Sequence, residues 1–346
     1  MFNFFKRKPK VNIENLGVIP DPRTPEEKEQ DYKSEELFSV SPIVWMEKPE
    51  SEWRKFPIFF QDYSSSCVAQ AIAKALGIEN WLEEQKFVQF SARDIYTRRL
   101  NRPQEGMYFT DGMNIGRKNG ATIEQLMPSQ GLNEPTMNVS EDRTPLTEAI
   151  AKIGRGGNNI TLPNDIEAVA SIIEPNGKPV VLGVRFNIDE WSKPVPTVSA
   201  NPPKYGHGIT GTNAILYQGK KSIIIEDSWG IDTGLNGRRV LTEDWFKAGR
   251  IVFAGYYDFL KNDGLEVKPK YQFSVNLKYG TTNSVDVKHL QECLAYLKLF
   301  PARDVFTGNF YGLTMAGVKA FQVLNGLLIT GICEEKTRAK LNEQFA

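Results

Sequence analysis

The sequence has few of the side chains that carry thiol, imidazole and metal chemistry. Only three cysteines and two histidines occur among its 346 residues. A chain of this length can bury a sizeable core without covalent cross-links, so the class of small disulfide-bonded scaffolds is excluded. Any cysteine- or histidine-based chemistry must therefore be assigned to one of five side chains.

Net charge and long apolar runs are also missing. The 42 lysines and arginines equal the 42 aspartates and glutamates, so no global positive field attracts a polyanion, and we expect no nucleic-acid partner. No run of about 18 apolar residues occurs, which excludes a transmembrane segment. Residues 1–10 place aromatic side chains before the basic cluster, the wrong order for a secretory signal. We therefore expect synthesis in the cytoplasm without a signal peptide.

Composition divides the chain into four segments. Residues 1–43 combine charge runs with prolines and show no apolar period, which predicts an extended arm. Residues 44–262 carry helical patterns first and strand patterns later, and this order predicts an α+β domain. The polar composition of residues 263–284 predicts a linker, with a short strand at Tyr271–Leu277. The pattern of residues 285–346 predicts a small all-α domain of three helices.

The last segment contains an internal repeat. Gly308 is followed six positions later by Thr314, and Gly331 is followed by Thr337 at the same spacing. Each copy predicts a turn that the glycine permits, leading into a helix that the threonine caps. A third apolar face, predicted at Val287–Leu297, completes a three-helix module.

Cys67 stands at the predicted start of a helix. Ser64–Ser66 precede it and offer N-cap oxygens, and apolar residues at helical spacing follow it. In the first turn of a helix, free N–H groups and the helix dipole stabilise a thiolate, the form in which cysteine acts as a nucleophile. The alternative is that Cys67 is a buried small apolar residue, which is the commoner role of cysteine.

Two further motifs supply a base and a carboxylate. His207 lies in a strand-like segment rich in small residues, which leaves room beside a sulfur atom. Asp227 follows a predicted strand, and Trp229 comes two residues later. The carboxylate could hold the imidazole tautomer while the indole shields that bond from water. Ordinary core packing of His207 and Trp229 is the alternative.

The order and spacing of these motifs resemble those of the papain-like cysteine peptidases. Gln61 precedes Cys67 by six residues, a Gly-His pair follows about 140 residues later, and Asp-Ser-Trp-Gly comes after a strand. The resemblance implies that Gln61 and the Cys67 N–H form an oxyanion hole and that His207 is the general base and acid. It also implies that Asp227 orients His207 and that Trp229 covers the pair.

The chain departs from the family pattern at several positions. Asp227 replaces the usual asparagine, and its charge should favour the imidazolium and strengthen the Cys–His ion pair. Ser64 and Val68 stand where the family commonly has a second cysteine and a tryptophan, and loss of that disulfide fits a reducing compartment. No helical propeptide of the family's type is visible in the arm, so we do not expect control by zymogen cleavage.

Residues 285–346 resemble the three-helix peptidoglycan-binding domain that many cell-wall enzymes carry. The resemblance rests on a Leu-Gln pair in the first helix, Val318–Gln322 in the second and Gly326–Gly331 in the following turn. It implies peptidoglycan as a partner. His289 and Cys293 share a helix face, but two ligands do not make a site, so we expect no metal and no cofactor.

Together these features predict a cysteine endopeptidase that acts at the bacterial cell wall on a peptide or protein substrate. The domain pairing and the lack of a signal peptide favour a bacteriophage product, an endolysin or a lysin carried in the virion, whose arm contacts virion proteins. Two alternatives stay open. One is an inactive peptidase-fold protein that anchors a structure to peptidoglycan, and the other is a peptidase whose substrate is a protein at the wall.

Overall fold

The computed structural model describes most of the two predicted domains. Most of the predicted arm, and the residues where the first domain was expected to meet the linker, lie outside the described residues. The described ranges are 17–19, 43–85, 87–154, 156–258, 267–297, 299–300 and 306–346. Within them, no helix has the length and apolar character needed to span a bilayer.

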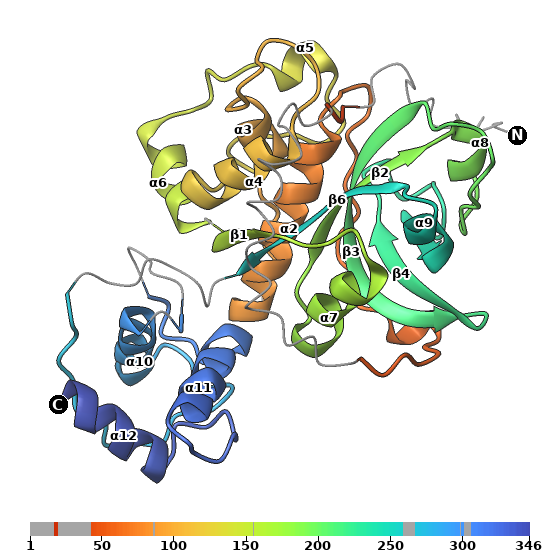
Figure 1. The fold of residues 1–346 in the computed structure, drawn as a ribbon. Coiled ribbons are helices and arrows are strands. Elements are labelled where there is room, and N and C mark those ends of the chain that lie inside the picture. Colours follow the sequence, from red (N-terminus) through yellow and green to blue (C-terminus); the bar gives the residue numbers. More distant parts are fainter. Residues whose placement is uncertain are drawn as a thin grey trace, which may run out of the picture.

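The first domain combines a helical part with a sheet, as predicted. Helix α2 (Cys67–Glu84) runs between the two parts, with the helices of residues 92–153 on one side and most of the sheet on the other (Figure 1). Its side chains Val68, Ile72 and Leu76 share one helix face and are buried. The remaining helices of this domain are η3 (Glu50–Glu52), α3 (Ala92–Tyr96), α4 (Phe109–Lys118), α5 (Glu134–Met137), α6 (Pro145–Ile153), α7 (Ile166–Asn176), α8 (Ile188–Trp191) and α9 (Glu243–Lys247).

The sheet has six antiparallel strands in the order β1-β6-β2-β3-β4-β5. Strand β3 packs on α2 with one face and is also contacted by α7. An apolar core lies between the sheet and α7, with Ile173, Leu182 and Ile223 fully buried in it. The strands are β1 (Asn158–Thr161), β2 (Val180–Phe186), β3 (Tyr205–Tyr217), β4 (Lys220–Glu226), β5 (Arg238–Thr242) and β6 (Ile251–Asp258).

The C-terminal module has the three predicted helices, α10 (Val285–Tyr296), α11 (Gly312–Leu324) and α12 (Glu335–Phe345). The prediction that threonines cap α11 and α12 is wrong, because Thr314 and Thr337 lie inside the first turns. Each hydroxyl instead accepts a hydrogen bond from a fully buried glutamine of the preceding helix, at 2.9 Å from Gln291 and 3.0 Å from Gln322. Each threonine hydroxyl therefore serves as an acceptor for a buried glutamine amide and does not cap its helix.

The two glutamines show how closely the repeat is copied. Gln291 Oε1 accepts from the N–H of Gly308, and Gln322 Oε1 accepts from the N–H of Gly331. Both glycines have the left-handed φ that the predicted turns require, 73° and 71°. Each glutamine thus ties one helix to the turn that leads into the next helix.

The predicted strand at Tyr271–Leu277 is wrong. Only Leu277 makes a bridge, with Cys333, and no partner strand runs beside the rest of the segment in the described part of the chain. The alternation has another cause, because the segment packs along α12. The N–H of Tyr271 donates to Phe345 O, and the N–H of Phe273 donates to the side chain of Asn342.

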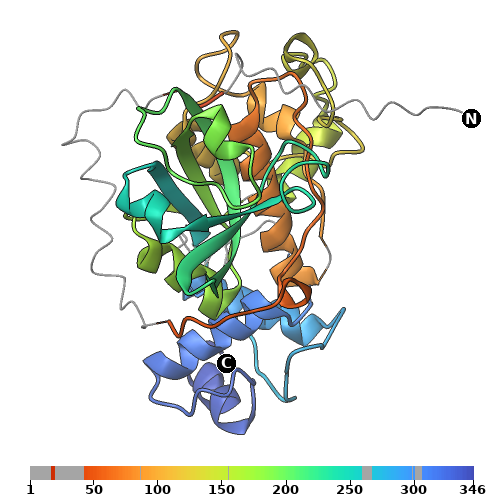
Figure 2. The ribbon, with the colours of Figure 1, turned by 90° about the vertical axis from the view of Figure 1, so that its right-hand side faces the viewer.

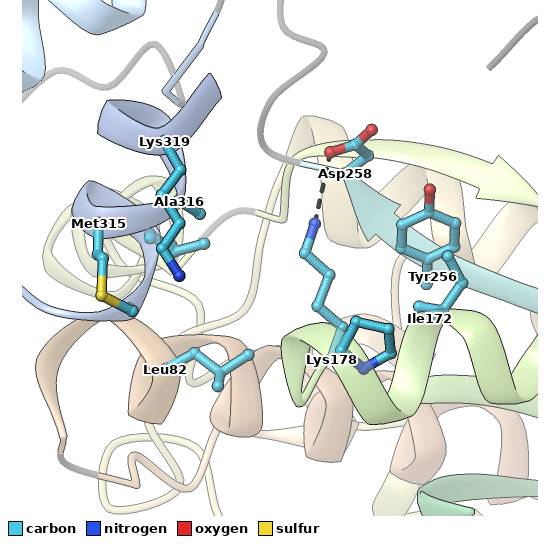
Figure 3. Close-up of a pocket in the computed structure, with 11 residues that line it drawn as sticks. Leu82, Ile172, Lys178, Tyr256, Asp258, Met315, Ala316 and Lys319 are labelled. Atoms are coloured by element: carbon cyan, nitrogen blue, oxygen red, sulfur yellow. Dashed lines mark hydrogen bonds and ion pairs between the residues drawn. The ribbon is translucent and has the colours of Figure 1, made fainter. Parts of the chain in front are cut away.

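The module lies at the C-terminal end of α2 (Figures 1 and 2). The first residue of α11, Gly312, comes so close that a Cβ there would stand 2.7 Å from Leu82 O. A cavity of about 260 Å³ opens at this junction, and an ion pair between Lys178 and Asp258 lies in its wall (Figure 3). None of its lining residues belongs to the motifs around Cys67.

Candidate active site

Cys67 is the first residue of α2, as predicted, and it is fully buried. As the first helical residue, it has a backbone N–H with no carbonyl partner within the helix. The capping prediction is wrong in detail, because Ser66 occupies the N-cap position but makes no side-chain capping bond. Its hydroxyl contacts Ser64 Oγ instead, at 2.8 Å. The first-turn N–H groups are therefore left to act on the sulfur and on groups near it.

The glycine after His207 lets β3 approach the start of α2. A Cβ on Gly208 would stand 3.0 Å from the backbone nitrogen of Val68 and 3.1 Å from the carbonyl carbon of Cys67. Two residues further along the strand, the hydroxyl of Thr210 donates to Ala71 O at 3.1 Å and fixes the same approach. The small residues around the histidine thus bring the imidazole to the cysteine.

The imidazole of His207 is completely buried and contacts Asp227, which directly follows β4. The distance from His207 Nε2 to Asp227 Oδ1 is 2.7 Å. The other ring nitrogen, Nδ1, bonds to no nitrogen or oxygen of the described residues. Burial alone would lower the pKa of His207, but the charge and hydrogen bond of Asp227, followed by those of Cys67, raise it to about 9. The imidazole therefore lies under the influence of both predicted partners.

Asp227 has two further partners that the sequence motifs did not reveal. Its Oδ2 accepts from Trp191 Nε1 and from Arg239 Nε, both at 3.0 Å. Burial opposes ionisation of this carboxyl, but His207 and Arg239 outweigh it and hold the pKa of Asp227 well below its usual range. The one available signal was the pair of arginines at the start of β5, a strand that is otherwise apolar or uncharged and is buried throughout.

Aromatic rings enclose the imidazole. The indole of Trp229 lies over His207 with ring centres 5.1 Å apart, which is the placement predicted for it. Trp191 and Phe186 present their edges from α8 and β2, with ring centres 6.0 and 6.3 Å from the imidazole. This shell excludes water from the His207–Asp227 bond and so strengthens it.

Gln61 is buried beside the cysteine loop and is held at both ends of its amide. Its Oε1 accepts from Ser228 Oγ at 2.6 Å, and its Nε2 donates to Ser64 O at 2.8 Å. An amide nitrogen carries two hydrogens, so a second one remains for another acceptor. The structure thus gathers all five predicted site residues: Gln61, Cys67, His207, Asp227 and Trp229.

A buried network supports the loop before Cys67. Glu134 accepts from the N–H of Ser65 at 2.8 Å and from the hydroxyl of Tyr96 at 2.7 Å. The same hydroxyl oxygen accepts from the N–H of Gly106 at 2.9 Å. One carboxylate therefore connects the cysteine loop to the backbone edge at Gly106 and Met107.

Residues 17–19 of the chain occupy that backbone edge. The N–H of Met107 donates to Gly17 O at 2.7 Å, and the N–H of Ile19 donates to Met107 O at 3.3 Å, so the two segments pair in parallel. A Cβ on Gly17 would stand 1.7 Å from Ser65 O, and a Cβ on Gly206 would stand 2.9 Å from Val18 Cβ. The segment thus lies between the loop before Cys67 and the strand residue before His207.

Comparisons with known proteins divide the chain in the same way as its structure. Residues 283–341 match the family model described as a putative peptidoglycan binding domain. A search of curated protein sequences finds no significant match to the chain. The all-α module predicted from the repeat is therefore a peptidoglycan-binding domain by family, and it contains helices α10–α12.

The first domain resembles solved cysteine proteases. Xylellain, a cysteine protease from Xylella fastidiosa, matches with a TM-score of 0.53 and 16% identity over 73% of this chain and 98% of xylellain. The first domain has the papain-like fold. Digestive procathepsin L 3 of the Tenebrio molitor larval midgut matches with the same TM-score and identity over 71% of this chain and 76% of that protein. At this identity the papain-like likeness concerns the fold.

The thiols of the peptidoglycan-binding domain lie in different surroundings. Cys293 and Cys333 are both fully buried in its apolar core. Burial raises the pKa of each thiol to about 12. His289 contacts Glu292 and stacks on Tyr271 with ring centres 4.0 Å apart. In the described part of the chain, no three side chains of the metal-binding types come together, so the spacing of His289 and Cys293 has no third ligand.

Proposed function

We propose that this chain is a cysteine endopeptidase that acts at the bacterial cell wall and is held there by its peptidoglycan-binding domain. One observation carries the proposal: a cysteine at a helix N-terminus and a carboxylate 2.7 Å from His207 Nε2 both act on the same buried imidazole. This is the arrangement that activates a thiol nucleophile. Peptidoglycan binding would raise the local concentration of the enzyme at its substrate.

The geometry supports a two-step reaction. The Cys67 thiolate attacks the carbonyl carbon of a peptide bond, and the negative oxygen receives hydrogen bonds from the Cys67 N–H and the second Nε2 hydrogen of Gln61. The His207 imidazolium then gives its proton to the leaving amine, and a thioester remains on Cys67. Water attacks the thioester while His207 takes a proton from it. The acid product leaves, and the thiolate–imidazolium pair is restored.

Residues 17–19 pair with the backbone of Met107 beside the loop that precedes Cys67, and a substrate could not use that backbone edge while they stay there. Their contact favours a form of the enzyme that excludes substrate until this segment leaves. It also favours the rival proposal, a protein with the peptidase fold that only anchors a structure to the wall. Carriage in a bacteriophage virion, with residues 1–43 contacting other virion proteins, is part of the proposal that rests on the domain pairing.

Hydrolysis assays distinguish the peptidase from the inactive anchoring protein. The full chain is incubated with purified cell walls and, in parallel, with an unfolded protein such as casein, and released amino groups are measured with Cys67→Ala as control. Release from walls by the wild type alone supports the proposal. Release from casein alone would indicate that the substrate is a protein and not the wall peptide. Equal release by both chains in each assay rejects the enzyme and supports the anchoring role.

Wall binding is tested separately by sedimentation. The full chain should sediment with purified walls, and a chain that ends at residue 258 should stay in the supernatant, because it lacks the peptidoglycan-binding domain. Equal sedimentation of the two chains would reject the tethering role.

A further inference from the structure

Asp227 contacts two basic side chains, one on each carboxylate oxygen. Oδ1 faces His207, and Oδ2 accepts from the guanidinium of Arg239 at 3.0 Å. The three side chains come from different parts of the sheet region: β3, the end of β4, and β5. They form a row in which the carboxylate stands between the imidazole and the guanidinium.

Arg239 is fixed in this position by more than Asp227. Its side chain is 3% exposed, while those of Asp227 and His207 are not exposed at all. Its Nη1 donates to Lys193 O at 3.0 Å, and its guanidinium lies 5.3 Å from the ring centre of Trp191. Because a guanidinium does not lose its proton in proteins, this buried positive charge is present at every working pH.

The charged and titratable groups on the side of His207 can be named element by element. The thiol of Cys67 on α2 and the carboxylate of Asp227 after β4 act on the pKa of His207 directly. Arg239 on β5 stands behind Asp227 and contacts its carboxylate. The other ring neighbours are uncharged: Phe186, Trp191 and Trp229. The charge that His207 experiences from its orienting side therefore depends on the sum of Asp227 and Arg239.

We propose that Arg239 is a positioning residue that offsets part of the charge of Asp227, so that the pair presents to His207 a weaker negative charge than a lone carboxylate would. In this way an aspartate does the work that papain-like peptidases usually assign to asparagine. A lone buried carboxylate would raise the pKa of His207 further and hold the imidazole proton more tightly. With Arg239 behind it, Asp227 still orients the ring, but His207 remains able to release its proton to a leaving amine. This inference rests on the proposed function.

The protonation of His207 can be measured directly in the full chain. Only two histidines occur, so an NMR titration of ¹⁵N-labelled imidazoles gives two signals, and His289→Gln identifies the second. The titration midpoint of His207 should be about 9 in the wild type. Arg239→Met should raise it by about one unit, because Asp227 is then uncompensated. Asp227→Asn should lower it by about two units, because an uncompensated Arg239 then faces the imidazole.

Two further variants keep the test informative if a single variant misfolds. The double variant Asp227→Asn/Arg239→Met leaves no unpaired buried charge, so it should fold better than either single variant and its midpoint should lie between theirs. Arg239→Lys keeps the charge and should stay within about half a unit of the wild type. A merely structural role for Arg239 would not give single-variant shifts of opposite sign.

The outcomes separate this inference from the proposed function. An unchanged midpoint in Arg239→Met, shifts of the same sign in both single variants, or a double variant outside their range would overturn the role of Arg239. A wild type that cuts neither walls nor casein would reject the proposed function whatever the midpoints are.

Discussion

The two domains place the same side-chain types in opposite electrostatic surroundings. Cys67 begins a helix and acts on an imidazole, whereas Cys293 lies within α10 in an apolar core that raises the pKa of its thiol to about 12. His207 is buried between a thiol and a carboxylate, and His289 is half-buried beside Glu292. Position in the fold, more than residue type, thus separates a candidate nucleophile from a structural thiol.

The largest expected effect comes from replacing one cysteine in each domain. Cys67→Ala should lower peptide hydrolysis by about 10⁴-fold or more, because the nucleophile and its base act as a unit. Cys293→Ala should leave the rate unchanged, since its thiol is structural. Rates on casein measure both. A similar loss of hydrolysis rate in the two variants would contradict the distinction between a nucleophilic and a structural thiol.

A substitution in the peptidoglycan-binding domain should separate binding from chemistry. Gln291→Met removes a fully buried amide, leaves the N–H of Gly308 without its acceptor and removes the donor to the Thr314 hydroxyl. It should lower the free energy of unfolding of this domain by about 2–3 kcal/mol. Urea unfolding and wall sedimentation measure the loss, while hydrolysis of casein should not change. Gln344→Met, at a half-buried position of α12, is the matched control and should cost less than about 0.5 kcal/mol.

The pH dependence of hydrolysis should reveal the imidazolium. Since the pKa of His207 is raised from 6.5 to about 9, the charged form persists up to that pH and is lost above it. Values of kcat/KM should therefore fall above about pH 9. The same sign holds for stability: the contribution of this proton is complete below pH 6.5 and is lost as the pH rises through about 9. A fall centred near the ordinary histidine value would contradict the buried contact with Asp227.

The smallest expected effect concerns access to Cys67. Gly17→Ala places a methyl group against Ser65 O, so residues 17–19 should leave Met107 more readily. Alkylation of Cys67 should become severalfold faster, and removal of residues 1–42 should give the same increase. Alkylation of Cys333 in the other domain is the internal control and should not change. Equal rates at Cys67 in all three chains would show that this segment does not cover the thiol.

The sequence predicted what depends on local pattern. The start of a helix at Cys67, the α+β class and the glycine turns of the repeat all follow from short-range spacing, and the structure confirms them. The catalytic roles assigned by resemblance stay predictions, although the residues do come together.

Contacts that depend on tertiary approach were missed. Arg239 and Trp191 reach Asp227 from separate elements. The arginine pair of β5 stands out in the sequence, but it does not say which carboxylate the side chain meets. Residues 17–19 pair through backbone atoms, which leave no side-chain pattern. The threonine caps were mispredicted for a similar reason, because buried glutamines from the preceding helices take the hydroxyl groups of Thr314 and Thr337.

Labelling with an epoxysuccinyl thiol inhibitor tests the central contrast most directly. The full chain and a chain that lacks residues 1–42 are treated in parallel, and the adduct is located by mass spectrometry. We predict modification at Cys67 alone, faster in the shortened chain and lost in His207→Ala. Two unmodified chains, or an adduct at Cys293 or Cys333, would contradict the account.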